Sequence, residues 1–307
     1  MLAYLKAVQP FLGEGGLSGI RISTRPDAVP EEILCILKEY GVTAVELGAQ
    51  SMSDRVLEMN QRGHTAQDVR EAAVCIRRQG FSLGLQMMYG LYGSTPEEER
   101  RTLEDCIALR PDTMRLYPTV ILEGTCLAER YRSGRYVLPS WEEMLDFAAM
   151  AMGRLREEGI RLIRCGLHVE QDLEKRMIAG FYHPALRELA ESRLYFKAMI
   201  CWMEKYAAEY RAFSQNGHGH TRYSFIVETA KGCAGKAAGH KGENRRRLCE
   251  RELFQNHLSA ECRMKIREVP DLAEGQLRMY MQQLVSGPDG RTIIRIGEEV
   301  YDVFKIT

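Results

Sequence analysis

Polar side chains gather at four places where a short apolar stretch of the sequence ends. These places are residues 23–27, 46–51, 86–95 and 115–118. If the apolar stretches are strands of one parallel sheet, their ends meet along one edge, where proteins of this architecture hold their ligands. The strand ends contain no evident pair of acid and base for proton transfer, so ligand binding is the chemistry we expect there. Arg115 and Tyr117 are candidates to face a substrate because of their position at a strand end.

The third strand end contains two glycines, Gly90 and Gly93, and then a helix start at Thr95. Glycine lets the backbone approach a ligand closely, and a helix N-terminus can face a carboxylate or a phosphate. A turn whose dihedral angles require glycine explains the same residues. Gln50, at the second strand end, is either an amide that binds a ligand or one that bonds to the next loop. The residues alone leave both pairs of alternatives open.

The elements that must position these residues follow from an alternation of short apolar and longer amphipathic stretches. This alternation is typical of βα units and a parallel sheet, and it predicts strands at residues 19–24, 44–50, 82–89, 114–121 and 161–167. Capping boxes predict helix starts at Thr65, Thr95 and Ser140. A closed parallel barrel has eight strands, and here a helix at residues 2–11 precedes the first strand. We therefore expect one or two further βα units upstream of Met1.

The chain is expected to have three parts. Residues 1–168 form the βα region, residues 169–210 a helical extension, and residues 211–307 a basic C-terminal α+β region. Between residues 211 and 270, twelve Lys and Arg stand against six Asp and Glu, whereas the 42 basic and 42 acidic residues of the whole chain cancel. A local excess of positive charge favours a nucleic-acid partner for the last part.

Composition excludes several classes of protein. With 45% hydrophobic residues among 307, the chain is too apolar to be disordered, and it has no apolar run near 18 residues that would predict a membrane span. The start has no signal-peptide pattern, so we expect a cytoplasmic location. The nine cysteines are separated by thirteen or more positions, which indicates reduced thiols and no metal site.

Four segments, taken in order, resemble the radical S-adenosylmethionine (SAM) enzymes. They are residues 23–27 (STRPD), 45–51 (VELGAQS) followed by 60–65 (NQRGHT), 89–95 (YGLYGST), and 117–120 (YPTV) followed by Gly124 and Thr125. Their order and spacing are similar to those of the radical SAM domain of the Elongator catalytic subunit, and oxygen-independent coproporphyrinogen oxidase is a more distant likeness. The resemblance covers roughly residues 1 to 200. It implies an α/β fold, a partial (β/α)6 barrel with only the later strands present, followed by the helix-rich α+β region.

The resemblance also implies a set of SAM contacts. The residues at positions where relatives contact SAM, or in the glycine loop near it, are Ser23, Gln50, Arg62, Gln86, Gly90 and Gly93. Relatives hold a four-iron four-sulfur cluster with a CxxxCxxC motif, which these 307 residues do not contain. We expect the motif upstream of Met1, and the chain by itself is then expected not to cleave SAM. Tyr92 departs from the proline usual in the glycine loop.

A second motif lies in the basic C-terminal part. Gly239 and Gly242 fit the GxxG turn by which KH-type modules clamp a nucleic-acid backbone, and the basic residues Arg245 and Arg246 follow. A glycine loop before an ordinary solvated helix explains the same residues. The leading hypothesis is the C-terminal portion of a radical SAM enzyme that reductively cleaves SAM to modify RNA, tRNA included. The alternative is a noncatalytic RNA-binding or scaffold protein on a degenerate barrel.

Overall fold

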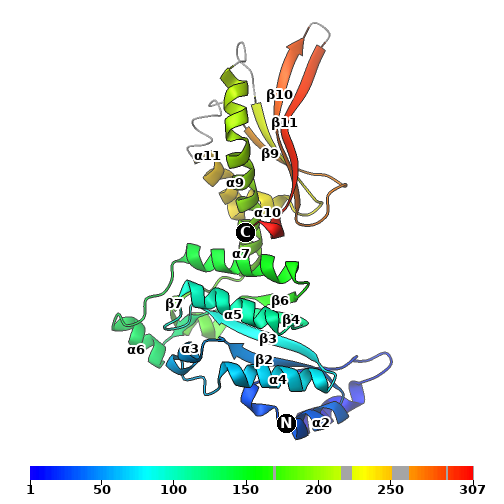
Figure 1. The fold of residues 1–307 in the computed structure, drawn as a ribbon, viewed down its shortest axis with the longest axis vertical. Coiled ribbons are helices and arrows are strands. Elements are labelled where there is room, and N and C mark those ends of the chain that lie inside the picture. The colour runs from blue at the N-terminus through cyan, green and yellow to red at the C-terminus, as the bar shows by residue number, and fades with distance from the viewer. Residues whose placement is uncertain (169–170, 216–222, 251–262, 288–289, 307) are drawn as a thin grey trace. The chain divides into compact units, whose positions relative to one another are not determined.

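The computed structural model of this protein describes residues 1–168, 171–215, 223–250, 263–287 and 290–306. The chain forms two compact units (Figure 1): unit 1 contains residues 1–144 and 158–186, and unit 2 contains residues 145–157 and 187–307. These divisions differ from the boundaries expected at residues 168 and 210. Helix α9 (Leu186–Gln215) continues through residue 210. Residues 145–157 pack within unit 2, where Asp146 pairs with Arg193 at 3.6 Å.

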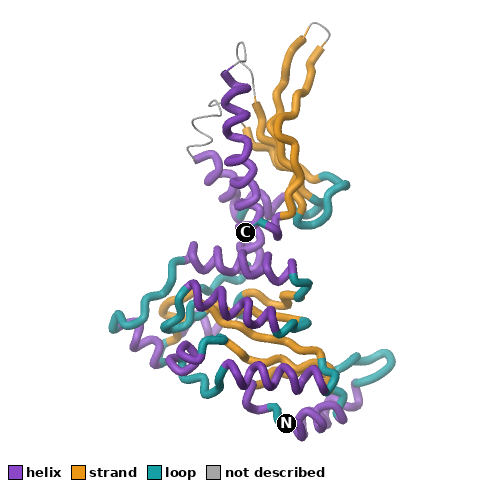
Figure 2. Tube along the Cα trace, in the orientation of Figure 1, coloured by secondary structure: helices purple, strands orange, loops and turns teal. Residues whose placement is uncertain are grey.

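Unit 1 is built on a five-stranded parallel sheet with the strand order β1–β2–β3–β4–β6. Its strands are β1 (Ile20–Thr24), β2 (Val42–Gln50), β3 (Ser82–Tyr89), β4 (Thr113–Pro118) and β6 (Arg161–Cys165). The helices are α1 (Leu2–Val8), α2 (Glu31–Glu39), α3 (Asp54–Met59), α4 (Ala66–Arg78), α5 (Pro96–Ala108), α6 (Cys126–Arg132), α7 (Trp141–Glu157, with residues 145–157 in unit 2) and α8 (Gln171–Arg176). Strands and helices alternate as in βα units (Figure 2), so the predicted fold class is confirmed.

The three predicted helix starts are confirmed. The hydroxyl of Thr65 accepts from the Asp68 N–H at 3.2 Å, and the hydroxyl of Thr95 accepts from the Glu98 N–H at 3.3 Å. Ser140 accepts in the same way, at 3.2 Å, from the N–H three residues later. Each hydroxyl satisfies a backbone donor that has no partner inside its helix.

The apolar face of the parallel sheet explains how the helices dock. Successive strand residues point to opposite faces, and on one face Leu47, Leu85 and Leu116 are at most 1% exposed. Helices α2 and α4 contact β2, and α4 and α5 contact β3. The burial of this face in turn leaves the opposite face for the polar residues of the same strands.

The strand predicted at residues 114–121 was too long. β4 ends at Pro118, whose ring leaves no N–H for a ladder. The backbone N–H and the hydroxyl of Thr119 both donate to the Tyr89 carbonyl, each at 2.9 Å. The chain turns there, so β5 (Val120–Leu122) pairs antiparallel with β7 (Met177–Gly180) in a separate two-stranded sheet.

Unit 2 contains a four-stranded sheet with the order β11–β10–β8–β9. Strands β8 (Tyr223–Thr229) and β9 (Arg263–Glu268) are parallel, and β10 (Gln276–Gly287) is antiparallel to β8 and to β11 (Gly290–Asp302). Helices α10 (Ala234–Ala238) and α11 (Glu243–Glu250) lie between β8 and β9 in the sequence. Trp202 of α9 stacks on Phe225 of β8 with ring centroids 4.9 Å apart and donates to the Gly297 carbonyl at 2.8 Å. Although α9 spans 30 residues, neither it nor any other described helix is apolar enough to cross a membrane.

Candidate functional site

A buried carboxylate, that of Glu46 in β2, organises the polar face of the parallel sheet. The residue is 1% exposed. Ser23 of β1 and Gln86 of β3 donate to its Oε2 at 3.2 and 3.1 Å. Arg21 of β1 donates to Oε1 at 2.8 Å, and Arg115 of β4 places its Nε 2.9 Å from Oε2. Three other strands of the sheet, β1, β3 and β4, therefore contribute side chains that converge on one carboxylate of β2.

The strand register explains this convergence. Ser23 lies directly opposite Glu46 in the pairing of β1 with β2, and Gly84 lies opposite Glu46 in β3. A Cβ at Gly84 would stand 2.5 Å from Cγ of Glu46. The glycine therefore leaves the space through which the Glu46 side chain passes over β3 toward Arg115 of β4.

The cluster keeps Glu46 ionised. Burial by itself raises the pKa of Glu46, but hydrogen bonds from Gln86, Arg21 and Ser23 and the charge of Arg115 outweigh it, and the pKa lies below its ordinary value. Ser23, Gln86 and Arg115 were predicted as site residues from the sequence, whereas Glu46, which joins them, was not singled out. The available signal was a carboxylate within an otherwise apolar strand, because such a group needs partners when it is buried.

Gln50 ends β2 in a left-handed backbone conformation with φ 63°, which is uncommon for a residue that has a Cβ. The N–H of Ser51 donates to the Ala49 carbonyl at 2.7 Å and closes a three-residue turn around Gln50. A Cβ at Gly48 would lie 2.6 Å from Nε2 of Gln50. Because Gly48 shares the face of Glu46, the Gln50 amide folds back over the polar face. Strained conformations of this kind are concentrated at ligand sites.

Arg62 follows α3 in a loop that is held against the ends of β1 and β2. Arg25 donates to the Gly63 carbonyl at 3.3 Å, and Nε2 of His64 lies 3.1 Å from the Ala49 carbonyl oxygen. Burial and the nearby charge of Arg25 lower the pKa of Arg62. The buried Nε of Arg62 has no hydrogen-bond partner among the described residues. A buried donor without a partner is costly, so this group is suited to an acceptor supplied by a ligand.

The glycine loop after β3 is fixed by the protein itself. Gly90 and Gly93 have φ values of 73° and 78°, which only glycine adopts readily. The Gly90 N–H donates to Glu99, and the Gly90 carbonyl accepts from Tyr136. Arg55 donates to the Gly93 carbonyl at 2.6 Å. The turn thus accounts for both glycines, and their contact with SAM stays a prediction.

Tyr92 stabilises the same loop by packing. Its ring lies edge-on to Tyr136 with centroids 5.8 Å apart, and the guanidinium of Arg130 lies 4.4 Å from the ring centroid. Asn60 donates to the Tyr92 carbonyl at 2.8 Å. Packing of the aromatic ring therefore constrains the loop at the position where the family usually has proline.

Glu99 gives the loop a pH-dependent contact. Burial raises the pKa of Glu99 from 4.5 to about 7. The folded state therefore keeps a proton that the unfolded state releases, and the free energy of unfolding falls as the pH rises through this interval. The wild type should lose on the order of 2 kcal/mol of its free energy of unfolding between about pH 5 and 7.5. Glu99→Gln should not show this loss when both proteins are unfolded in urea. Glu97→Gln, a control on the same helix, should keep the wild-type slope, and a wild-type slope in Glu99→Gln would contradict the assignment.

The predicted site residues lie at different places relative to Glu46. Arg115 also donates to the Tyr117 hydroxyl at 3.2 Å. The structure joins four predicted residues through Glu46, namely Ser23, Gln86, Arg115 and Tyr117. Gln50 lies over the same face, whereas Arg62, Gly90 and Gly93 occupy neighbouring loops with no direct contact to Glu46 in the described structure. The predicted RNA residues lie in unit 2, namely Gly239, Gly242, Arg245 and Arg246.

The polar face and the cysteines differ in their fit to a cofactor. Across the described ranges, no three His, Cys, Asp or Glu side chains come together in a way that could hold a metal ion. Burial raises the pKa of the Cys106 thiol to about 12, the opposite of what a thiolate ligand requires. The described cysteines therefore do not fit an iron–sulfur cluster. The polar face, together with the Arg62 Nε that has no hydrogen-bond partner among the described residues, does fit a ligand that carries hydroxyl, amide-like and carboxylate groups.

The fold and the site define an α/β protein of the partial βα-barrel class with a polar sheet face around a buried carboxylate. Residues 2–106 match the family model of the radical SAM superfamily, and residues 111–195 match the model of the radical SAM C-terminal domain. The two matches together cover more than half of the chain. The chain therefore belongs to the radical SAM superfamily, as the sequence motifs predicted.

Relatives of the Elongator type are similar to this chain. The tRNA uridine(34) acetyltransferase of Dehalococcoides mccartyi is 38% identical over 122 residues, which are 38% of this chain and 26% of that protein. Elongator complex protein 3 of Homo sapiens is 33% identical over 180 residues, 57% of this chain and 32% of that protein. The archaeal Methanocaldococcus infernus Elp3 with an N-terminal deletion has the same fold, with a TM-score of 0.53 at 20% identity over 90% of this chain and 56% of that chain. The chain spans about a quarter to a third of the length of these curated relatives.

Proposed function

We propose that this chain provides the SAM-holding part of a radical SAM enzyme that modifies RNA. The observation that supports this most strongly is the polar face around Glu46, which lies in a sheet of the radical SAM superfamily and contains residues from four strands. When bound, SAM would supply the 5′-deoxyadenosyl group from which the radical chemistry of this superfamily starts. The part assigned to this chain is to bind and orient SAM and the substrate.

The side chains at the site retain hydrogen-bonding groups that a ligand could use. Nε2 of Gln86 donates both to Glu46 and to Ser23, each at 3.1 Å, so its carbonyl oxygen remains to accept from a ligand hydroxyl. Arg62 has a buried Nε donor that suits the carboxylate of SAM. We assign Gln50 to the adenosyl side of the ligand because its amide lies over the same face.

The RNA substrate is proposed from the relatives, whose names include tRNA uridine(34) acetyltransferases. Arg115 and Tyr117 are the proposed substrate-facing pair, since both lie on the polar face near the carboxyl end of β4. The proposal includes no acetyl transfer, because the matched residues are those of the radical SAM models alone.

Calorimetry with SAM and the full chain tests the proposal. We expect saturable binding that Arg62→Gln weakens at least tenfold, or about 1.4 kcal/mol, without a change in thermal unfolding. Arg100→Gln on the exposed side of α5 removes the same charge and should bind as the wild type does. Absence of SAM binding, or wild-type affinity in Arg62→Gln, would contradict the assignment.

A noncatalytic RNA-binding protein is the second candidate, favoured by the GxxG turn between α10 and α11. The two candidates differ in one measurement: a noncatalytic RNA-binding protein binds RNA but shows no heat of SAM binding in calorimetry. Calorimetry therefore separates the two functions with the same sample.

A further inference from the structure

The segment between the two parallel strands of unit 2 has a defined arrangement. β8 and β9 pair in parallel, with Ser224 opposite Arg263 and Thr229 opposite Glu268. Parallel neighbours need a long connection, and here it contains α10, a glycine turn and α11. The described order is strand, helix, GxxG turn, helix, strand, so the turn joins the end of α10 to the start of α11.

The glycine turn itself requires both glycines. Gly239 has φ 81°, and a Cβ there would lie 2.6 Å from the backbone N of Asn244. Gly242 has φ 75° with no atom within 4 Å of its Cβ position, so the backbone on this side is open. Nδ2 of the buried Asn244 lies 3.0 Å from Oγ of Ser192 and 3.2 Å from the Ala237 carbonyl oxygen. These contacts fix the start of α11 against α9 and α10, so the turn is preformed.

Four of the cations around the turn form no ion pair within the described part of the chain. Residues 231–248 contain six Lys and Arg and one Glu. Lys236 and Arg247 are paired, with Glu191 at 2.8 Å and Glu243 at 3.6 Å. The exposed side chains that form no ion pair with another described residue are Lys231, Lys241, Arg245 and Arg246.

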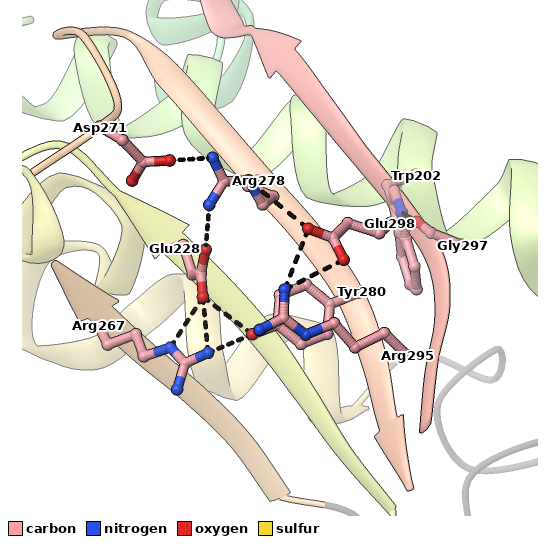
Figure 3. Close-up of polar contacts among 9 residues, drawn as sticks. All are labelled: Trp202, Glu228, Arg267, Asp271, Arg278, Tyr280, Arg295, Gly297 and Glu298. Carbon is pink, nitrogen blue, oxygen red and sulfur yellow. Dashed lines mark hydrogen bonds and ion pairs between the residues drawn. The ribbon is translucent and has the colours of Figure 1, made fainter. Parts of the chain in front are cut away.

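A second group of arginines in unit 2 provides the contrast. Figure 3 shows that each of these arginines is paired with carboxylates: the arginines are Arg267, Arg278 and Arg295, and the carboxylates are Glu228, Asp271 and Glu298. Glu228 is 3% exposed and accepts from Tyr280 at 2.8 Å. Burial raises the pKa of Glu228, but hydrogen bonds from Tyr280 and the two arginines outweigh it and hold the pKa below its ordinary value. These arginines therefore stabilise the sheet, whereas the cations at the turn are available to an anionic partner.

We propose that the turn at residues 239–242, with the flanking cations Lys241, Arg245 and Arg246, clamps the sugar–phosphate backbone of single-stranded RNA. A GxxG turn between two helices lets about four nucleotides approach the backbone closely. Free cations beside it supply the charge that phosphates require. This inference rests on the proposed function only in the choice of RNA as the polyanion. In this proposal unit 2 binds the RNA strand.

The test is the double substitution His240→Asp and Lys241→Asp in the full chain. Both side chains are exposed, so the change places negative charge at the turn without altering the packed core. We expect fluorescence anisotropy with a labelled, mixed-sequence single-stranded RNA dodecamer to show at least tenfold weaker binding. The dependence of affinity on salt should fall by about 0.7 log units per log unit of salt, as for one lost phosphate contact on a single strand. SAM affinity should not change.

The matched control is Arg100→Asp with Arg101→Gln, which makes the same change of charge on the exposed surface of α5. It should retain most of the RNA affinity. Equal losses in both double variants would mean a general charge effect and would overturn the clamp. Wild-type affinity in the turn variant, or equal binding of duplex and single-stranded RNA, would overturn it as well. SAM calorimetry on the same samples reports separately on the proposed function.

Discussion

Replacing Glu46 with glutamine is expected to weaken SAM binding at least a hundredfold and to lower the free energy of unfolding by about 3 kcal/mol. Glutamine has nearly the same shape but no charge. The guanidinium groups of Arg21 and Arg115, which now lie 2.8 and 2.9 Å from the carboxylate, would then repel each other beside a half-buried face. Glutamine has only one accepting oxygen, so it cannot accept from Arg21 on one side and from Ser23 and Gln86 on the other, and the ligand contacts lose their positions.

Urea unfolding and SAM calorimetry on the same variant measure the two effects. Glu97→Gln, whose side chain is 73% exposed, is the control for loss of a carboxylate and should change neither quantity by a measurable amount. The double variant Glu46→Gln with Arg115→Gln should be less unstable than the sum of its single changes, because the two residues share one ion pair. Additive effects, or wild-type SAM affinity in Glu46→Gln, would contradict the role given to the carboxylate.

Gly48→Ala is expected to weaken SAM binding about tenfold, or about 1.4 kcal/mol, with little change in stability. The new Cβ would stand 2.6 Å from Nε2 of Gln50, the far end of a flexible side chain. That side chain can move aside at low cost, but its amide then leaves the polar face. Weaker SAM binding without a loss of stability would therefore report on the position of Gln50 and not on the integrity of the fold.

Calorimetry and thermal unfolding of Gly48→Ala provide the measurement. Gly235→Ala is the matched control, since no atom lies within 4 Å of its Cβ position and it belongs to unit 2. Equal SAM affinity in Gly48→Ala and wild type would remove Gln50 from the site. A large loss of stability would show instead that the β2 end cannot adapt.

Local sequence signals predicted the elements of unit 1 well because their causes are local. Thr65 and Thr95 cap helices through residues three positions away, and the strand ends follow from apolar runs. The end of β4 was misjudged because it depends on Thr119 bonding to the Tyr89 carbonyl, 30 positions earlier. The expected boundary at residue 210 differs from the structure because a continuous helix crosses it.

The candidate site was predictable only in part, for a related reason. The resemblance pointed to single residues such as Ser23 and Gln86, each at a strand end. Glu46 joins them through partners 23 and 40 positions away, and no spacing along the chain reveals such contacts. Only the register of the parallel strands brings Ser23, Glu46 and Gln86 side by side on one face of the sheet. In unit 2, the sequence for the same reason does not reveal which arginines form ion pairs with other described residues and which do not.

The structure of the full chain crystallised with S-adenosylhomocysteine tests the central claim most directly. We expect the ligand at the carboxyl edge of β1 to β3, with its hydroxyl groups within hydrogen-bonding distance of Ser23 and Gln86 and its carboxylate at Arg62. An ordered ligand elsewhere on the molecule, or a polar face that stays empty at saturating ligand, would contradict the assignment of this face to SAM.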